Sequence, residues 1–266
     1  MHKPDYGIDF PGLVRFFFIA GIVSLAAVIA VTMVDVTWVT VKNGLSLLAA
    51  AVSVYLLGMG VFMVYYSRKL KLHDRDLILD LHTWSGSEKV LDVGCGRGLL
   101  LIGAAKRLTT GTALGIDVWR AEDQGSNSPE ATIENAVVEG VCARIEVKTA
   151  DMRQIPSGDN SFDVIVSNWT VHSLDATRDR RTALTEMVRV LRPGGTLLIA
   201  DIVNQDEYFK FLVEHGMKDV QRHSNAARDA VLNALTFGSF APFVVSARKN
   251  SCSKRATSFF SHPARK

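Results

Sequence analysis

The sequence predicts an α/β fold, in which a doubly wound, mostly parallel sheet is preceded by an α-helical transmembrane hairpin. Over residues 87–249, short apolar segments alternate with helical segments, and this alternation is typical of a parallel sheet covered by helices on both faces. The first 66 residues instead hold two apolar stretches that are far too long for strands.

Both apolar stretches are long enough to cross a membrane. Residues 13–34 contain one charged side chain, Arg15, and residues 44–66 contain none. About 20 apolar residues cross a hydrocarbon core of ~30 Å, whereas a buried helix of a soluble protein rarely lacks charge over such a length. A cleaved signal peptide fits poorly, because the first stretch is too long and a second follows at once. We therefore expect a membrane hairpin over residues 1–66.

The basic residues around the hairpin predict its orientation. The linker 35–43 carries one lysine, Lys42. Four basic residues follow the second span, namely Arg68, Lys69, Lys71 and Arg75. By the positive-inside rule the basic side faces the cytoplasm. The sequence thus predicts a membrane protein with two spans, whose C-terminal domain and both termini are cytoplasmic.

After the hairpin, residues 67–86 are expected to form a linker and an amphipathic helix, residues 87–249 the α/β domain, and residues 250–266 a basic disordered tail. The expected strands cover residues 89–93, 113–117, 144–148, 162–167, 196–201 and 243–247. The expected helices cover residues 70–84, 99–108, 129–140, 180–191 and 207–215. Ser128 is expected to cap the third of these helices, with Pro129 at its first position.

The net charge and the cysteines argue against nucleic-acid binding, a disulfide framework and a metal site. A net charge of +3 gives no case for nucleic-acid binding. The cysteines, Cys95, Cys142 and Cys252, are odd in number and far apart. They form neither a disulfide framework nor a metal-binding pattern, so no metal site is expected and a reducing compartment is favoured.

The segment after the first expected strand, residues 92–98, has the sequence DVGCGRG. Alternating glycines let the backbone turn sharply and let a ligand approach main-chain atoms at the start of the next helix. The dinucleotide fingerprint fails, because Leu99 stands at its last glycine position. The P-loop pattern also fails, because Ala104 and Ala105 replace its Lys-Ser/Thr pair.

This D-x-G-x-G-x-G segment resembles motif I of the class I S-adenosylmethionine-dependent methyltransferases. Further blocks resemble that family in the same order, at residues 114–117 (LGID), 149–152 (TADM), 162–168 (FDVIVSN) and 191–195 (LRPGG). The resemblance covers about residues 87–249. It implies a seven-stranded Rossmann-like sheet, S-adenosylmethionine as cofactor and methyl transfer as the reaction.

The resemblance also implies the cofactor site. The cofactor-binding residues would be Asp92, Gly94, Cys95, Gly96, Gly98, Asp117, Val118, Asp151, Met152 and Asn168. Asp117 would hold the ribose hydroxyls, Asp151 and the backbone of Met152 the adenine, and Asn168 would face the methyl donor. Each acid also has a plainer alternative role. Asp92 would then only form a turn, and Asp117 and Asp151 would be solvated acids at the ends of strands. For Cys95, a small side chain tolerated in the loop is favoured over a reactive thiol.

Two segments beyond this core are candidates for contact with the acceptor. His172 follows the fourth expected strand, and a histidine there suits proton removal at neutral pH; the alternative is a capping or packing role. In the polar loop 118–127, Trp119 is a candidate to cover the adenine, and Glu122 and Asp123 are candidates to face the substrate. A solvated loop is the alternative.

The anchor suggests a small, apolar or membrane-associated acceptor, such as a prenyl quinone or a lipid. A tether to a membrane-bound partner complex is the alternative, and the sequence does not indicate which protein partners it has. Two other functions stay open, a catalytically inactive membrane scaffold or binding protein and a nicotinamide-dependent oxidoreductase. The failed dinucleotide fingerprint disfavours the second.

Overall fold

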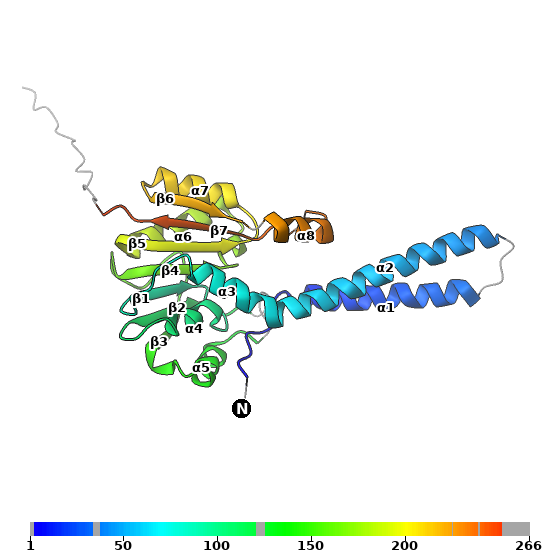
Figure 1. Cartoon of the computed structure of the whole chain (residues 1–266), viewed down its shortest axis with the longest axis horizontal. Helices are drawn as coiled ribbons and strands as arrows, with labels where there is room; N and C mark the ends of the chain where they lie inside the picture. The colour runs from blue at the N-terminus through cyan, green and yellow to red at the C-terminus, as the bar shows by residue number, and fades with distance from the viewer. Residues whose placement is uncertain (1–2, 34–37, 121–125, 225, 239, 252–266) are drawn as a thin grey trace, which may run out of the picture.

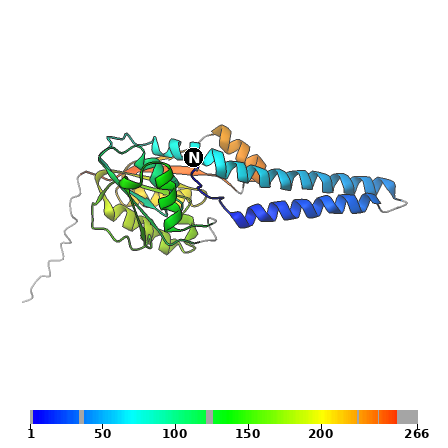
Figure 2. The ribbon, with the colours of Figure 1, turned by 90° about the horizontal axis from the view of Figure 1, so that it is seen from below.

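The computed structural model describes residues 3–33, 38–120, 126–224, 226–238 and 240–251. Two long helices, α1 (Pro11–Met33) and α2 (Val39–Tyr65), lie side by side and project from one end of the α/β domain (Figures 1 and 2). Both are long and apolar enough to cross a membrane. In the most hydrophobic 18-residue stretch of each, only 6% and 17% of the stretch, respectively, is buried. The other residues that the structure describes therefore leave most of these apolar surfaces uncovered.

Helix α2 continues into the domain without a break. A π-helical turn, η1 (Tyr66–Leu70), joins it to α3 (Lys71–Leu79), so that 41 residues form one rod. No glycine or proline occurs between Gly60 and Gly86 to end the helix earlier. The expected linker is thus part of the rod. The expected amphipathic helix is present but ends five residues early, at Leu79.

The domain is a seven-stranded sheet with the strand order β3-β2-β1-β4-β5-β7-β6. The strands are β1 (Lys89–Val93), β2 (Thr112–Asp117), β3 (Ile145–Thr149), β4 (Phe162–Asn168), β5 (Leu191–Asp201), β6 (Lys218–His223) and β7 (Phe243–Arg248). Strands β1 to β5 pair in parallel, and β7 runs antiparallel to both β5 and β6. The predicted doubly wound, mostly parallel sheet is confirmed.

Helices cover both faces of this sheet. They are α4 (Leu99–Ala105), α5 (Pro129–Val138), α6 (Thr177–Val190) and α7 (Gln205–Glu214). One core cluster joins α6 and α7 to the sheet through residues such as Leu184 and Phe211. The other joins α3 and α4 through residues such as Leu79 and Leu101. Ser128 caps α5 as predicted, because its side chain accepts a hydrogen bond from Ala131 N.

Two elements are absent from the sequence-based expectation. Strand β6 has a mostly polar sequence, KDVQRH, without apolar alternation, because it lies at the edge of the sheet and pairs on one side only. Helix α8 (Ala226–Thr236) follows it and extends along α2 rather than over the sheet (Figure 1). The expected C-terminal tail falls mainly on residues 252–266, which lie outside the described residues.

Residues 4–10 form an N-terminal strap that runs from the α/β domain into α1. Asp5 N donates to Asn135 Oδ1 at 2.8 Å, and Arg97 Nε donates to Asp5 O at 2.6 Å. The buried ammonium of Lys71 donates to the carbonyls of Tyr6 and Gly7, each at 2.8 Å. The strap therefore holds the start of α1 next to the α/β domain.

Candidate active site

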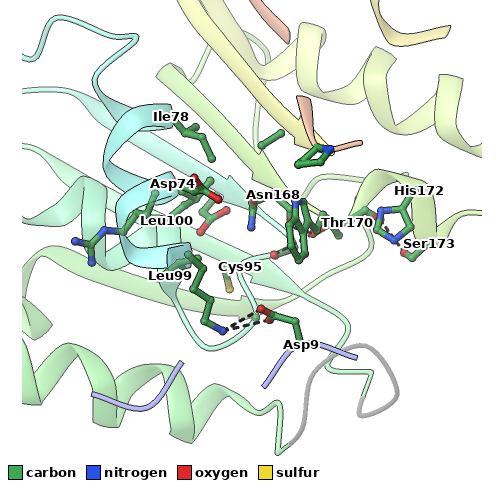
Figure 3. A pocket seen from close by; sticks show the side chains of 18 of the residues that line it. Asp9, Asp74, Ile78, Cys95, Leu99, Leu100, Asn168, Thr170, His172 and Ser173 are labelled. Atoms are coloured by element: carbon green, nitrogen blue, oxygen red, sulfur yellow. Dashed lines mark hydrogen bonds and ion pairs between the residues drawn. The ribbon is translucent and has the colours of Figure 1, made fainter. Parts of the chain in front are cut away.

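A cavity of about 480 Å³ lies between the sheet and the base of the hairpin formed by α1 and α2. Its walls include the carboxyl ends of β1, β2 and β4 and the α2–α3 rod at Tyr66. The strap contributes Asp9 to the wall (Figure 3). Strands β1 and β4 are neighbours whose connections leave in opposite directions, and ligands of open α/β sheets bind outside the carboxyl ends of strands at such a switch point.

The cavity gathers nearly all of the predicted cofactor residues. Its lining contains Asp92, Gly94, Cys95, Gly96, Asp117, Val118, Asp151, Met152 and Asn168, together with His172. Gly98 lies outside the lining, at the start of α4 with φ +87°. A Cβ there would meet the side chains of Ile102 and Thr132 at 2.9 Å, so packing of the loop against α4 and α5 explains this glycine.

The glycine loop is held against its neighbours by close backbone contacts. Gly94 has φ +73°, and a Cβ there would lie 2.0 Å from Thr170 Cγ2. Gly94 N donates to Ile116 O at 2.8 Å. Cys95 is buried, and burial raises the pKa of its thiol well above the usual value. A thiol whose pKa is raised stays protonated at neutral pH and is a poor nucleophile, in agreement with the plainer role expected for Cys95.

Asp117 ends β2 and faces the glycine loop. One carboxylate oxygen accepts from Gly96 N at 2.8 Å, and the other accepts from Trp119 N at 2.6 Å. These bonds fix the carboxylate, and each oxygen keeps lone-pair capacity for a further donor. A carboxylate held in this way suits a ligand that presents a pair of hydroxyl groups.

Asp92 is a buried acid in the wall of the cavity. Its side chain belongs to a residue that is 1% exposed, and its Oδ2 atom has no hydrogen-bond partner among the described residues. Burial raises the pKa of this carboxyl to about 8, and the nearby charge of Asp117 contributes. A buried, unpartnered carboxyl oxygen is costly. Because the residue lies in the cavity wall, a positively charged ligand group would compensate this cost, and S-adenosylmethionine carries such groups.

Asp151 follows β3 and is paired within its own loop. Arg153 Nη2 lies 2.6 Å from Asp151 Oδ2, and this pairing lowers the pKa of the carboxyl. The other end of the Arg153 guanidinium binds Asp179 at 2.9 Å. Arg153 was not among the sequence-predicted residues, although its place two residues after Asp151 is visible in the sequence. The neighbouring Met152 is buried in the cavity wall.

The loop after β2 differs from its expected arrangement. The indole N–H of Trp119 donates to Thr149 Oγ1 at 2.8 Å, and the ring packs against the core cluster around α4. Trp119 does not line the cavity, although its neighbours Val118 and Arg120 do. Glu122 and Asp123 lie outside the described residues.

His172 lies in a short 3-10 turn after β4 and points toward the cavity (Figure 3). Its Nδ1 lies 2.5 Å from Oδ1 of Asp201, the last residue of β5. Asp201 is fully buried and also accepts from the hydroxyl of Tyr208 at 2.9 Å. The carboxylate thus holds the imidazole in one orientation. Sequence reasoning missed Asp201 and Tyr208, because they come from other elements.

An aromatic wall closes the cavity on the side of the hairpin. The ring of Trp169 stacks on Tyr66, with centroids 5.7 Å apart and planes 5° apart, and it stacks on Phe10 at 6.1 Å. Phe240 meets the Trp169 ring edge-on at 5.4 Å. The wall thus joins the strap, the rod, the turn after β4 and the chain before β7. Its residues are distant in sequence, so no local pattern predicts it.

Comparison with known proteins identifies the domain. Residues 91–199 match a family described as "Methyltransferase domain". The methyltransferase GfsG of Streptomyces halstedii is 40% identical over 119 residues, which are 45% of this chain and 39% of the relative. The uncharacterized methyltransferase Rv0089 of Mycobacterium tuberculosis is 34% identical over 131 residues, 48% of this chain and 57% of the relative. The chain thus spans about half the length of these relatives or less.

Solved structures share the fold at low sequence identity. A geranyl diphosphate C-methyltransferase from Streptomyces coelicolor, in complex with Mg²⁺, geranyl diphosphate and S-adenosyl-L-homocysteine, aligns with a TM-score of 0.54 at 14% identity, over 70% of this chain and 82% of that one. A SAM-dependent methyltransferase from Aquifex aeolicus aligns with a TM-score of 0.51 at 24% identity, over 68% and 92%. Residues 91–199 thus match a methyltransferase domain, and the α/β domain has the Rossmann-like fold of the S-adenosylmethionine-dependent methyltransferases.

Proposed function

We propose that this protein is a membrane-anchored methyltransferase that transfers a methyl group from S-adenosylmethionine to a small, apolar or membrane-associated acceptor. A single cavity is lined both by the acids of the predicted cofactor site, Asp92 and Asp117, and by Tyr66 at the base of the long apolar helix α2. An acceptor entering from the hairpin side would therefore meet the cofactor directly.

The cofactor supplies a methyl group that is already activated on a sulfonium. The chain has to hold it, align the acceptor and exclude water. In this proposal Asp117 holds the ribose hydroxyls, while Asp151 and the backbone of Met152 meet the adenine. Asp92 and the glycine loop meet the positively charged amino-acid end, and Asn168 borders the methyl group.

His172 is proposed as the base for an acceptor that arrives protonated, such as a phenol, a thiol or an acid. Asp201 is an acceptor for the proton on His172 Nδ1, at 2.5 Å. The neutral imidazole then carries its lone pair on Nε2, the atom that would take the acceptor's proton. Asp201 acts through His172 and is a positioning residue.

The membrane assignment rests on α1 and α2 and on the charges at their base. Arg68 and Lys69 are exposed on η1, directly after the apolar part of the rod. Basic side chains at that level favour the cytoplasmic leaflet, where anionic head groups attract them. Both termini and the α/β domain are then cytoplasmic. The aromatic wall of Phe10, Tyr66 and Trp169 suits an apolar acceptor.

Cofactor binding is expected to depend on Asp117. The carboxylate of Asp117 would accept hydrogen bonds from the two ribose hydroxyl groups. Asp117→Asn removes its negative charge and one acceptor oxygen, so it should weaken the binding of S-adenosylmethionine by about 10- to 100-fold. Glu146→Gln, an exposed acid on β3, is the matched control and should leave the Kd unchanged. Calorimetry on the detergent-solubilised chain measures both. Binding of NADH instead would indicate an oxidoreductase, and binding of neither cofactor would indicate an inactive scaffold.

The buried acid Asp92 is expected to make the ligand-free protein less stable as the pH rises. The folded state holds the Asp92 proton up to about pH 8, whereas the unfolded chain releases it near pH ~4. The folded state therefore binds the extra proton between these values, and stability falls as pH rises through this window. Asp92→Asn should raise the Tm at pH 8 more than at pH 5, while weakening S-adenosylmethionine binding.

Asp219→Asn, at an exposed position on β6, is the control for this pH dependence and should follow the parent at every pH. Thermal unfolding between pH 5 and pH 8 tests the expectation. If Asp92→Asn and the parent keep the same difference in Tm over this range, Asp92 does not carry the buried proton.

Loss of the His172 imidazole is expected to slow methyl transfer without loss of cofactor. For an acceptor that must lose a proton, His172→Ala should lower turnover by about 10²- to 10⁴-fold, with the Kd for S-adenosylmethionine within about twofold of the parent. His73→Ala, at an exposed position of α3, is the control. Transfer of label from S-adenosylmethionine into native membranes gives the rate, and equal rates for mutant and parent at all pH values would remove His172 from the mechanism.

A further inference from the structure

Helix α8 reaches along the membrane hairpin, away from the sheet (Figures 1 and 2). The hydroxyl of Tyr55 in α2 donates to the carbonyl of Leu235 at 2.9 Å, and its ring lies 5.8 Å from that of Phe237. Tyr55 precedes Tyr66, at the cavity, by a stretch that is roughly 16 Å long at the helical rise of ~1.5 Å per residue. The C-terminal end of α8 therefore lies well along the hairpin.

The surface at this end of α8 is apolar and exposed. Val231 is 57% exposed, Leu235 37% and Phe237 83%, whereas Leu232 is 4% exposed and faces inward. The neighbouring part of α2 is exposed and apolar as well, with Val54 at 74%. The two surfaces are continuous through Tyr55, so whatever covers α2 at that level also meets the end of α8.

We propose that residues 231–237, the α8 tip, insert into the lipid leaflet on the domain side and form a second membrane contact of the protein. The proposal rests on the proposed anchoring of α1 and α2. It commits to the bilayer as the occupant, because the exposed apolar side chains of the tip continue a surface that the bilayer already has to cover. The tip is too short to span and would lie at the boundary between head groups and acyl chains, at a depth of ~5–10 Å.

The contact with Tyr55 also locates the end of the hydrocarbon core along α2. About 20 residues cross the core, so a span that starts near Trp38, an exposed aromatic typical of an interface, ends near residue 58 rather than covering the expected residues 44–66. Lys42, in the first turn of α2, would then reach up to the outer head groups. Residues 237, 238 and 240–242, which follow α8, are not helical. Hydrocarbon excludes such backbone when lipid surrounds it. The inner boundary is therefore nearer Tyr55 than Tyr66, and the apolar base of α2 lies in the interface.

Both ends of α8 connect this membrane contact to the cavity. Arg228, in its first turn, lines the cavity and lies 3.4 Å from Asp74 of α3. After the tip, the chain returns through Pro242 and Phe243, which also line the cavity. The wall between the lipid leaflet and the site is thus made partly of α8, so an acceptor dissolved in that leaflet would enter beside this helix.

Depth-dependent quenching of a fluorescent label tests the insertion of the tip. Phe237→Cys is introduced into the full chain with Cys142 and Cys252 replaced by serine, while the buried Cys95 is kept. The labelled protein is reconstituted into vesicles of phosphatidylcholine and phosphatidylglycerol with doxyl-labelled lipids. Leu47→Cys on α2 serves as the deep reference, and Lys210→Cys on α7 as the aqueous reference. A thermal transition matching that of the parent shows that each variant is folded.

The label at position 237 should be quenched at least threefold more strongly than the label at position 210, and most strongly by a doxyl group near the head group. Quenching at position 47 but not at position 237 would overturn the insertion of the tip and leave the anchor in place. A shielded but unquenched label at position 237 would indicate a protein partner or a second copy instead, and would also overturn it. Absence of quenching at position 47 would reject the anchor itself, and the tip with it.

Discussion

The buried ammonium of Lys71 determines how the hairpin of α1 and α2 meets the α/β domain. It donates to two carbonyls of the strap, those of Tyr6 and Gly7, and it pairs with Asp9 at 3.2 Å. Burial lowers the pKa of this lysine, and Asp9 opposes that shift. A buried charge is costly unless it is paired and hydrogen-bonded. Because the strap supplies these partners, its backbone is held where its carbonyls reach the ammonium group. This arrangement starts α1 beside η1 and places the aromatic wall over the carboxyl ends of the strands.

Charge is distributed unevenly around the cavity, and the environment gives each acid a different property. Asp92 is buried with an unpartnered oxygen and a pKa raised to about 8, whereas Arg153 lowers the pKa of Asp151. Asp117 is held by backbone N–H groups of the glycine loop. A cationic ligand would compensate the unfavourable burial of Asp92. The ligand-free site is thus less stable than an apolar core, as expected of a binding site.

The sequence predicts those parts of the structure that local patterns encode. The strand after residue 88, the glycine loop and the cap at Ser128 depend on neighbouring residues, and their spacing reveals them. The sheet follows from the alternation of strands and helices. The pairing of His172 with Asp201 was not predictable, because β4 and β5 bring together residues that are distant in the chain. The strap and β6 were missed for related reasons, since the strap binds through backbone carbonyls and β6 has no apolar alternation.

In the proposed function, the cavity joins a methyl donor to an acceptor that comes from the membrane. The most direct measurement incubates the full-length protein in its native membranes with methyl-labelled S-adenosylmethionine and then partitions the products between organic and aqueous phases. Label in the organic phase, dependent on Asp117, is the predicted result. Label confined to the aqueous or protein fraction, with cofactor binding intact, would contradict a membrane-derived acceptor and reduce the hairpin to a tether.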